Sequence, residues 1–290
     1  MSQPLGVHSL VWTGETSVDA LREAIGRTRS AGFGLLELNL SAPSDLDVAG
    51  IAETFAMAPV APGASLALRA DHDVSSTDLA TVRRGEELLL AALDVLHAVG
   101  GTLLCGVLYS ALGKYTRAAT PAGRANAVAV VRQLAQAAAE RGMRLALEVV
   151  NRYESNLFNT CADALRFIDE VGEDNVSVHL DTYHMNIEED DMSAPVLLAG
   201  DRLGYVHVGE SHRGYLGSGT IDFPTFFRAL DSIGYDRVIT FESFSSAVVN
   251  ASLSGTLAVW RNLWTDSDDL ARHAVTFIRG QLTAAGSHNA

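Results

Sequence analysis

The sequence is poor in cysteine and has no long apolar segment. Its two cysteines, Cys105 and Cys161, are too few for a disulfide framework and lack the spacing of a metal-binding motif. We expect both to be small buried side chains. No segment reaches the ~18 consecutive apolar residues of a membrane-spanning helix, and the first residues do not combine a basic segment with a long apolar one. These absences predict a cytoplasmic protein with no membrane partner.

Basic residues and prolines are also scarce. Lysine and arginine together number 21 against 35 aspartates and glutamates, which gives a formal net charge of -14. Nucleic acids and anionic membranes bind basic surfaces, so this balance argues against a nucleic-acid partner. The chain has only 7 prolines and no linker-like segment, and 48% of its 290 residues are hydrophobic. It can therefore bury one large core, and we predict a single domain over residues 1–290.

Short apolar or β-branched segments alternate with amphipathic helical ones along the chain. The predicted strands are 6–12, 35–40, 65–68, 102–109, 144–150, 176–180, 203–208 and 238–241. The predicted helices are 18–31, 48–57, 79–99, 121–141, 161–171, 194–199, 224–234 and a last region, 253–282, that divides near 265–269. Asp78 and Thr120 are expected N-caps, and 184–192 is expected to be a polar loop. Eight strand–helix units predict an α/β fold, the (β/α)8 TIM barrel.

Four consecutive predicted strands end in a side chain that can bind a metal. The segment LALEVVNRYE places Glu148 in an apolar strand, where an unpaired charge is unfavourable. VSVHLDTYH, LGYVHVGESHR and VITFESF repeat the pattern with Asp181, His207 and Glu242. Taken singly, His207 could be a core histidine and Glu242 could pair with Arg213. Because the carboxyl ends of barrel strands meet on one face, four in succession favour a shared metal site.

One imidazole and three carboxylates suit a hard or borderline cation such as Mn²⁺, Co²⁺ or Mg²⁺. Three carboxylates around one divalent ion leave the site negative, which favours a neutral sugar or polyol over an anionic substrate. Barrels often bind phosphate after strands seven and eight, where this chain has GYLGSGT (214–220). That loop has no lysine, and we expect its glycines simply to form turns.

Longer strings carry a resemblance to a known family. VHSLVWTG, LEVVNRYE, HLDTYHMNIEE, HVGESHRGYLGSGTIDF, FESFSS and VWRNLW resemble the ketose 3-epimerases, the D-tagatose, D-allulose (D-psicose) and L-ribulose 3-epimerase group of the xylose-isomerase-like barrels. The likeness covers nearly the whole chain. It implies a metal, usually Mn²⁺ with Co²⁺ or Mg²⁺ as substitutes, bound by Glu148, Asp181, His207 and Glu242. It also implies a homodimer or homotetramer.

The resemblance further implies that Glu148 and Glu242 are the catalytic acid/base pair, and that Glu154, His184 and Arg213 hold the carbonyl end of a free ketose. Inverting C3 requires a proton to leave one face and return to the other, which a single fixed base cannot do. The metal would polarise the C2 carbonyl and stabilise an enediolate. The candidate substrate pairs are D-fructose/D-allulose, D-tagatose/D-sorbose and L-ribulose/L-xylulose.

Other predicted pocket residues depend on position alone. His8 and Trp12, at the end of the first strand, are expected to line the substrate pocket, although Trp12 could equally be packing at the barrel end. Tyr109 and residues 110–115 are expected near the far end of the sugar. Here the string GVLYSA resembles the L-ribulose and allulose branch of the family.

Three rival functions remain open from the sequence. The same ligand set serves aldose–ketose isomerases and hydroxypyruvate isomerase, which move a proton between C1 and C2. A metal-dependent endonuclease would require more histidine ligands and a basic groove, and the negative net charge argues against such a groove. A non-enzymatic sugar-sensing module would keep Arg213 and Glu154, but it would not need opposed carboxylates at Glu148 and Glu242.

Overall fold

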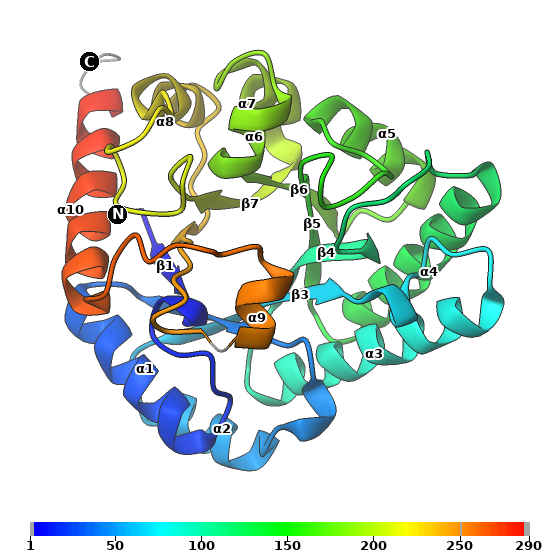
Figure 1. The fold of residues 1–290 in the computed structure, drawn as a ribbon, viewed down its shortest axis with the longest axis horizontal. Coiled ribbons are helices and arrows are strands. Elements are labelled where there is room, and N and C mark those ends of the chain that lie inside the picture. The colour runs from blue at the N-terminus through cyan, green and yellow to red at the C-terminus, as the bar shows by residue number, and fades with distance from the viewer. Residues whose placement is uncertain (1–2, 250, 287–290) are drawn as a thin grey trace.

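The computed structural model describes residues 3–249 and 251–286. Eight parallel strands close into a barrel in the order β1 to β8, and the helices surround it (Figure 1). The strands are β1 (Leu5–His8), β2 (Leu35–Asn39), β3 (Ala61–Leu68), β4 (Leu103–Ala111), β5 (Arg144–Glu148), β6 (Val176–Asp181), β7 (Leu203–Val208) and β8 (Ile239–Phe241). The closed ring of strands confirms the predicted (β/α)8 TIM barrel.

The helices follow the strands as the alternation predicts. They are α1 (Val18–Ala31), α2 (Val48–Ala56), α3 (Leu79–Ala98), α4 (Pro121–Glu140), α5 (Cys161–Val171), α6 (Thr182–Glu188), α7 (Ala194–Ala199), α8 (Phe223–Ser232), α9 (Ala251–Thr256) and α10 (Ser267–Gly286). Asp78 and Thr120 are N-caps, as predicted: their side chains accept hydrogen bonds from the backbone N–H groups of Ala80 and Gly123. No helix among the described residues is long and apolar enough to cross a bilayer.

The structure differs from the predicted elements most clearly in four places. The last predicted helical region, 253–282, is two helices, α9 and α10, and the break between them, 257–266, begins before the predicted 265–269. β1 ends at His8, and a short 3-10 helix, Ser9–Val11, replaces the rest of the predicted strand. β3 begins at Ala61, because pairing with β2 extends it through Pro62 and Gly63, which read as turn residues in the sequence. The expected polar loop is largely the helix α6, which Asp181 caps by accepting a hydrogen bond from Tyr183 N–H.

The middle of the barrel is polar, although branched apolar side chains usually fill this space. The Tyr205 hydroxyl on β7 lies 2.7 Å from Glu37 Oε2 on β2 and 2.5 Å from Thr240 Oγ1 on β8. Because β2 and β7 are not neighbours in the ring, the contact between Tyr205 and Glu37 crosses the barrel interior. A hydrogen-bonded layer therefore lies beneath the carboxyl ends of the strands.

Candidate active site

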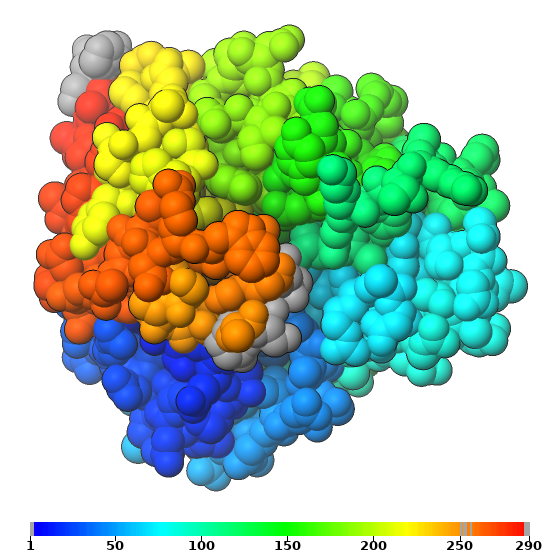
Figure 2. Space-filling model, in the orientation of Figure 1, coloured from blue at the N-terminus to red at the C-terminus, as the bar shows by residue number. Residues whose placement is uncertain are grey.

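A cavity of about 730 Å³ opens at the carboxyl ends of the strands. Its polar lining includes His8, Ser65, Glu148, Glu154, His184, Arg213 and Glu242, and its apolar lining includes Leu66, Leu112, Phe244 and Leu257. Leu257 follows α9, and Figure 2 shows this part of the chain, in orange, over the middle of the face. The cavity therefore has a charged floor and an apolar cover.

The four predicted metal ligands meet at the floor of this cavity. Glu148, Asp181, His207 and Glu242 are all buried, and each offers a ligand atom within 4.8 Å of the other three. Nδ1 of His207 lies 3.8 Å from Glu148 Oε1 and 3.5 Å from Glu242 Oε1. Asp181 and His207 are paired in the β6–β7 register, which keeps their side chains adjacent. One imidazole and three carboxylates thus converge, in a set that could hold a divalent cation.

The orientation of His207 also fits a cation. Its Nε2 hydrogen-bonds Glu37 Oε2 at 2.9 Å, which leaves Nδ1 facing the carboxylates. This Nδ1 is buried and has no hydrogen-bond partner among the described residues. Metal-binding histidines commonly donate their second nitrogen to a carboxylate in this way. An unpaired buried nitrogen beside two carboxylates is a donor arrangement that suits a divalent cation.

Glu37 is the functional residue that the sequence predictions omit. It is fully buried on β2, and burial by itself would raise its pKa. The charge of His207 and its hydrogen bond outweigh burial and hold the pKa of Glu37 below its usual value. The signal was present in LLELN, where a glutamate interrupts an apolar strand just as Glu148 does.

Arg213 contacts two of the four candidate ligands. Its Nη1 donates to Asp181 Oδ2 at 2.9 Å and to Glu242 Oε2 at 2.7 Å. The pairing of Glu242 with Arg213 therefore exists alongside the four-residue cluster and does not replace it. The guanidinium also lies 3.9 Å from the centroid of the Tyr183 ring. Arg213 partly neutralises the carboxylates while its edge borders the cavity.

The backbone of Arg213 has a left-handed conformation, with φ at 61°, which a non-glycine residue adopts at some energetic cost. Its carbonyl accepts a hydrogen bond from Ser243 Oγ, and Ser243 Oγ accepts one from Trp264 Nε1 at 2.7 Å. Trp264 is buried. A Cβ at Gly209 would lie 2.8 Å from Arg213 Nη1, so glycine is needed there for the guanidinium to pass.

Glu148 and Glu242 differ in electrostatic environment. Burial raises the pKa of Glu148, although His184 and His207 partly oppose this. Burial also acts to raise the pKa of Glu242, but the charges of His207 and Arg213 outweigh it and hold that pKa well below its usual value. In the protein by itself, Glu148 therefore retains a proton more readily than Glu242 does. Paired carboxyls with separated pKa values are typical of acid/base sites.

His184 and Glu154 lie beside the cluster, as predicted. Nε2 of His184 is 3.6 Å from Glu148 Oε1 and 3.9 Å from Glu154 Oε2. Nδ1 of His184 accepts a hydrogen bond from Asn151 Nδ2 at 2.9 Å, so Nε2 carries the proton and points toward the carboxylates. The same amide donates to Glu154 Oε1 at 2.9 Å. Asn151 thus orients both predicted substrate-binding residues, a role that the sequence predictions did not assign.

The remaining predicted pocket residues divide into two groups. His8 lines the cavity and lies 3.0 Å from Ser65 Oγ through its Nε2. Trp12 is not among the cavity-lining residues: its Nε1 donates to Thr28 Oγ1 of α1 at 2.9 Å, which matches the packing alternative. Tyr109 is fully buried, and its ring stacks on Phe158 with centroids 3.8 Å apart.

The expectation for Tyr109 therefore needs correction, since its hydroxyl donates to the carbonyl of Glu148 at 2.7 Å and does not reach the cavity. From the loop after β4, Leu112 lines the cavity. After β7, Gly217 N–H donates to Glu210 Oε2 at 2.8 Å, and φ at Gly217 is +80°. The glycines of 214–220 form turns around a carboxylate, as expected, and Glu210 would repel a phosphate there.

The fold and the convergent site define a class of protein. The family model described as xylose isomerase-like TIM barrel matches residues 25–281. An L-ribulose 3-epimerase of Methylomonas is 54% identical over 274 residues, which cover 94% of this chain and 96% of that protein. A ketose 3-epimerase of Arthrobacter globiformis is 51% identical over 280 residues, with 97% of each chain covered.

Solved structures point to the same family as the sequence relatives. D-allulose 3-epimerase of Methylomonas in complex with D-allulose has a TM-score of 0.94 and 53% identity, covering 97% of this chain and 98% of that one. A structure of L-ribulose 3-epimerase has a TM-score of 0.96 and 42% identity, and the match covers 100% of this chain and 97% of that one. The chain belongs to the ketose 3-epimerases, a family of carbohydrate isomerases within the xylose isomerase-like TIM barrels. This confirms the family and the enzyme class predicted from the sequence.

Proposed function

We propose that this enzyme epimerises free ketoses at C3, with Glu148 and Glu242 as the acid/base pair. The observation that carries the proposal is the placement of these two buried carboxylates beside one histidine nitrogen, His207 Nδ1, at 3.8 and 3.5 Å. Glu148 ends β5 and Glu242 follows β8, and these strands are separated in the ring by β6 and β7. A substrate bound between them can meet a carboxylate on each face.

Glu148, Asp181, His207 and Glu242 would hold the cation, for which we propose Mn²⁺, with Co²⁺ or Mg²⁺ as substitutes. Three carboxylates and one imidazole are a donor set that such ions accept. When bound, the ion supplies Lewis-acid polarisation of the carbonyl and neutralises negative charge that develops on the sugar oxygens. The convergence of these four side chains supports a metal-dependent reaction.

The proton steps belong to the two glutamates. One carboxylate removes the C3 proton, and the electron pair that is left delocalises into the carbonyl to give an enediolate. The other carboxyl group then donates a proton to C3 from the opposite face, which inverts the centre. The separated pKa values of Glu148 and Glu242 allow one to carry a proton while the other accepts one. Exchange with water then restores both groups.

Recognition of the sugar would fall to the remaining polar residues of the cavity. His184 Nε2–H and Arg213 are donors beside the reacting centre, and Glu154 accepts from a sugar hydroxyl. His8 borders the same cavity. Leu112 and Phe244 cover the carbon chain. We leave Trp12 out of this set because it packs against α1.

We propose D-fructose/D-allulose, L-ribulose/L-xylulose and D-tagatose/D-sorbose as the substrate pairs to test. The activities of two relatives, an L-ribulose 3-epimerase and a D-allulose 3-epimerase with D-allulose bound, support the first two. A homodimer or homotetramer is part of the proposal, on the ground of the family resemblance. The single domain over residues 1–290 and the cytoplasmic location stay predictions.

The decisive experiment is proton NMR of the Mn²⁺-loaded protein with D-fructose in D₂O, with the metal-free protein as control. Deuterium at C3 together with D-allulose signals supports the proposal. Deuterium confined to C1, together with an aldose, would instead identify an aldose–ketose isomerase. If D-fructose is inert, L-ribulose and D-tagatose are tested in the same way. Absence of C3 exchange with all three ketoses would refute the proposed reaction.

A further inference from the structure

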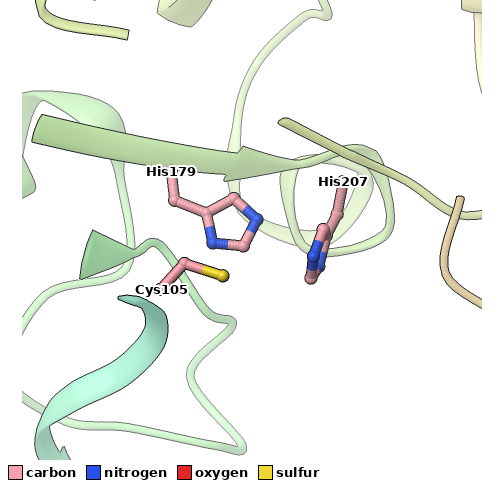
Figure 3. A group of neighbouring side chains, drawn as sticks. All are labelled: Cys105, His179 and His207. Atoms are coloured by element: carbon pink, nitrogen blue, oxygen red, sulfur yellow. The ribbon is translucent and has the colours of Figure 1, made fainter. Parts of the chain in front are cut away.

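A second group of candidate ligands lies inside the barrel, in contact with the catalytic cluster. Cys105 on β4, His179 on β6 and His207 on β7 each offer a ligand atom within 4.8 Å of the other two. Figure 3 shows the three side chains converging. Their exposed fractions are 1%, 0% and 0%. The rings of His179 and His207 meet edge to face, with centroids 4.1 Å apart. Only His207 belongs to both groups.

His179 is the anomaly that the proposed reaction does not explain. Neither of its ring nitrogens has a hydrogen-bond partner among the described residues, although the side chain is completely buried. A buried polar atom left without a partner is unfavourable, so buried imidazoles normally find one. Tyr205, the other aromatic neighbour, contacts His179 through its ring, with centroids 5.1 Å apart. A lone pair on His179 is therefore available for a ligand.

The chemistry of this second group differs from that of the carboxylate cluster. A thiolate and two imidazoles form a soft to borderline donor set, which selects Zn²⁺ or Co²⁺ over Mn²⁺ and Mg²⁺. Ligand atoms around a tetrahedral zinc ion lie about 3.3–3.8 Å apart, given Zn–N and Zn–S bonds of about 2.0 and 2.3 Å. Side-chain movements on the order of 1 Å would close the present separations to that range. A thiol that coordinates such an ion gives up its proton.

We propose that Cys105, His179 and His207 form a second, inhibitory cation site that takes a thiophilic divalent ion such as Zn²⁺. Inhibition follows from the sharing of His207. Its Nδ1 faces Glu148 and Glu242, and its Nε2 is hydrogen-bonded to Glu37. An inhibitory ion that binds Nδ1 removes His207 from the catalytic ligand set. One that binds Nε2 breaks the hydrogen bond to Glu37, which orients the ring. By linkage, an ion at the catalytic site must weaken binding at the second site by the same factor.

Cobalt is the probe that separates this site from the carboxylate cluster. Co²⁺ is titrated into the metal-free protein, and thiolate-to-Co²⁺ charge transfer is followed in the near ultraviolet. Only a site that contains a cysteine produces this band. Cys105→Ala removes the sulfur, and Cys105→Ser is a second variant of nearly unchanged size. Cys161→Ala is the matched control: Cys161 is also a buried free cysteine and donates to the carbonyl of Pro195, as Cys105 donates to that of Ala64, but it belongs to no described ligand group.

We expect the band in the wild type and in Cys161→Ala, and its loss in both Cys105 variants, which should still bind Co²⁺ at the carboxylate cluster. We also expect Zn²⁺ to inhibit the Mn²⁺-loaded wild type at concentrations at least about tenfold lower than it needs for Cys105→Ala. A wild type without a thiolate band at millimolar Co²⁺, or equal Zn²⁺ inhibition of both proteins, would overturn the proposal. The absorption experiment needs no turnover, so its result is independent of the proposed epimerase reaction.

Discussion

Glu37 on β2 accepts a hydrogen bond from Nε2 of His207 on β7, at 2.9 Å, across the interior of the barrel. The contact joins strands that are far apart in the chain and not adjacent in the ring. It fixes which nitrogen of His207 faces the carboxylates. Tyr205 adds a second hydrogen bond to the same oxygen of Glu37. The geometry of the candidate metal site therefore depends on a residue that touches none of the three carboxylates.

Replacing Glu37 with Gln should weaken metal binding more than catalysis. Gln keeps the size of the side chain but removes the charge that holds His207, and loss of such an outer carboxylate typically costs about 10–100-fold in metal affinity. Isothermal titration with Mn²⁺ measures this, and kcat is compared at saturating metal. Glu210→Gln is the control, since Glu210 is a buried carboxylate at the same barrel end that binds loop N–H groups instead. Equal Mn²⁺ affinities in wild type and Glu37→Gln would show that Glu37 does not position His207.

Glu148→Gln and Glu242→Gln should each reduce turnover to below a few per cent, because positioned acids and bases each contribute about 10²- to 10⁴-fold. If each carboxylate serves one face of C3, a single variant should still exchange deuterium into one epimer without inverting it. NMR in D₂O at saturating Mn²⁺, started separately from each epimer, measures this. An unchanged melting temperature shows that the fold survives. Retention of full epimerisation by either variant would reject the two-carboxylate assignment.

Removal of the metal should abolish activity and lower thermal stability. Ion binding to the folded state alone stabilises it by about 2.7 kcal/mol when the free ion is at a hundred times its dissociation constant. For a chain of this size, that corresponds to a rise of a few degrees in Tm. Differential scanning fluorimetry with EDTA and then with excess Mn²⁺ provides the comparison. Asp181→Asn, which weakens one ligand, should show a smaller rise in Tm on addition of Mn²⁺. A wild-type Tm that does not change with Mn²⁺ would contradict a bound cation.

Asn151→Ala should impair substrate binding by releasing His184. The amide of Asn151 donates to Nδ1 of His184, which keeps the proton on Nε2. Without this bond the imidazole can take the other tautomer, so we expect KM for the ketose to rise about tenfold, in line with the loss of one hydrogen bond in a buried site. Asn156→Ala is the matched control, since Asn156 lies in the same loop but donates to the carbonyl of Arg117. A shift in KM shared by both variants would point to a general disturbance of the loop.

The sequence alone determined the order of elements and predicted four residues of the candidate site. Each strand and most helices can be predicted from the residues within and next to them. Strand periodicity, helix N-caps such as Asp78 and the glycine that ends α1 are all interactions between residues close together in the chain. Glu148, Asp181, His207 and Glu242 were visible because each is a polar residue at the end of an apolar strand. Parallel strands bring such ends together whatever the details of packing.

Only the tertiary structure decided which side chains meet across the barrel. That Glu37 faces His207, and that His179 lies beside Cys105 without a hydrogen bond, depends on the closure of the ring. The same holds for Trp12, whose indole turns to Thr28 and not to the cavity. Local patterns report which residues are buried. They do not report which distant residue each one meets, because that contact is set by the stagger of strands that never pair with one another.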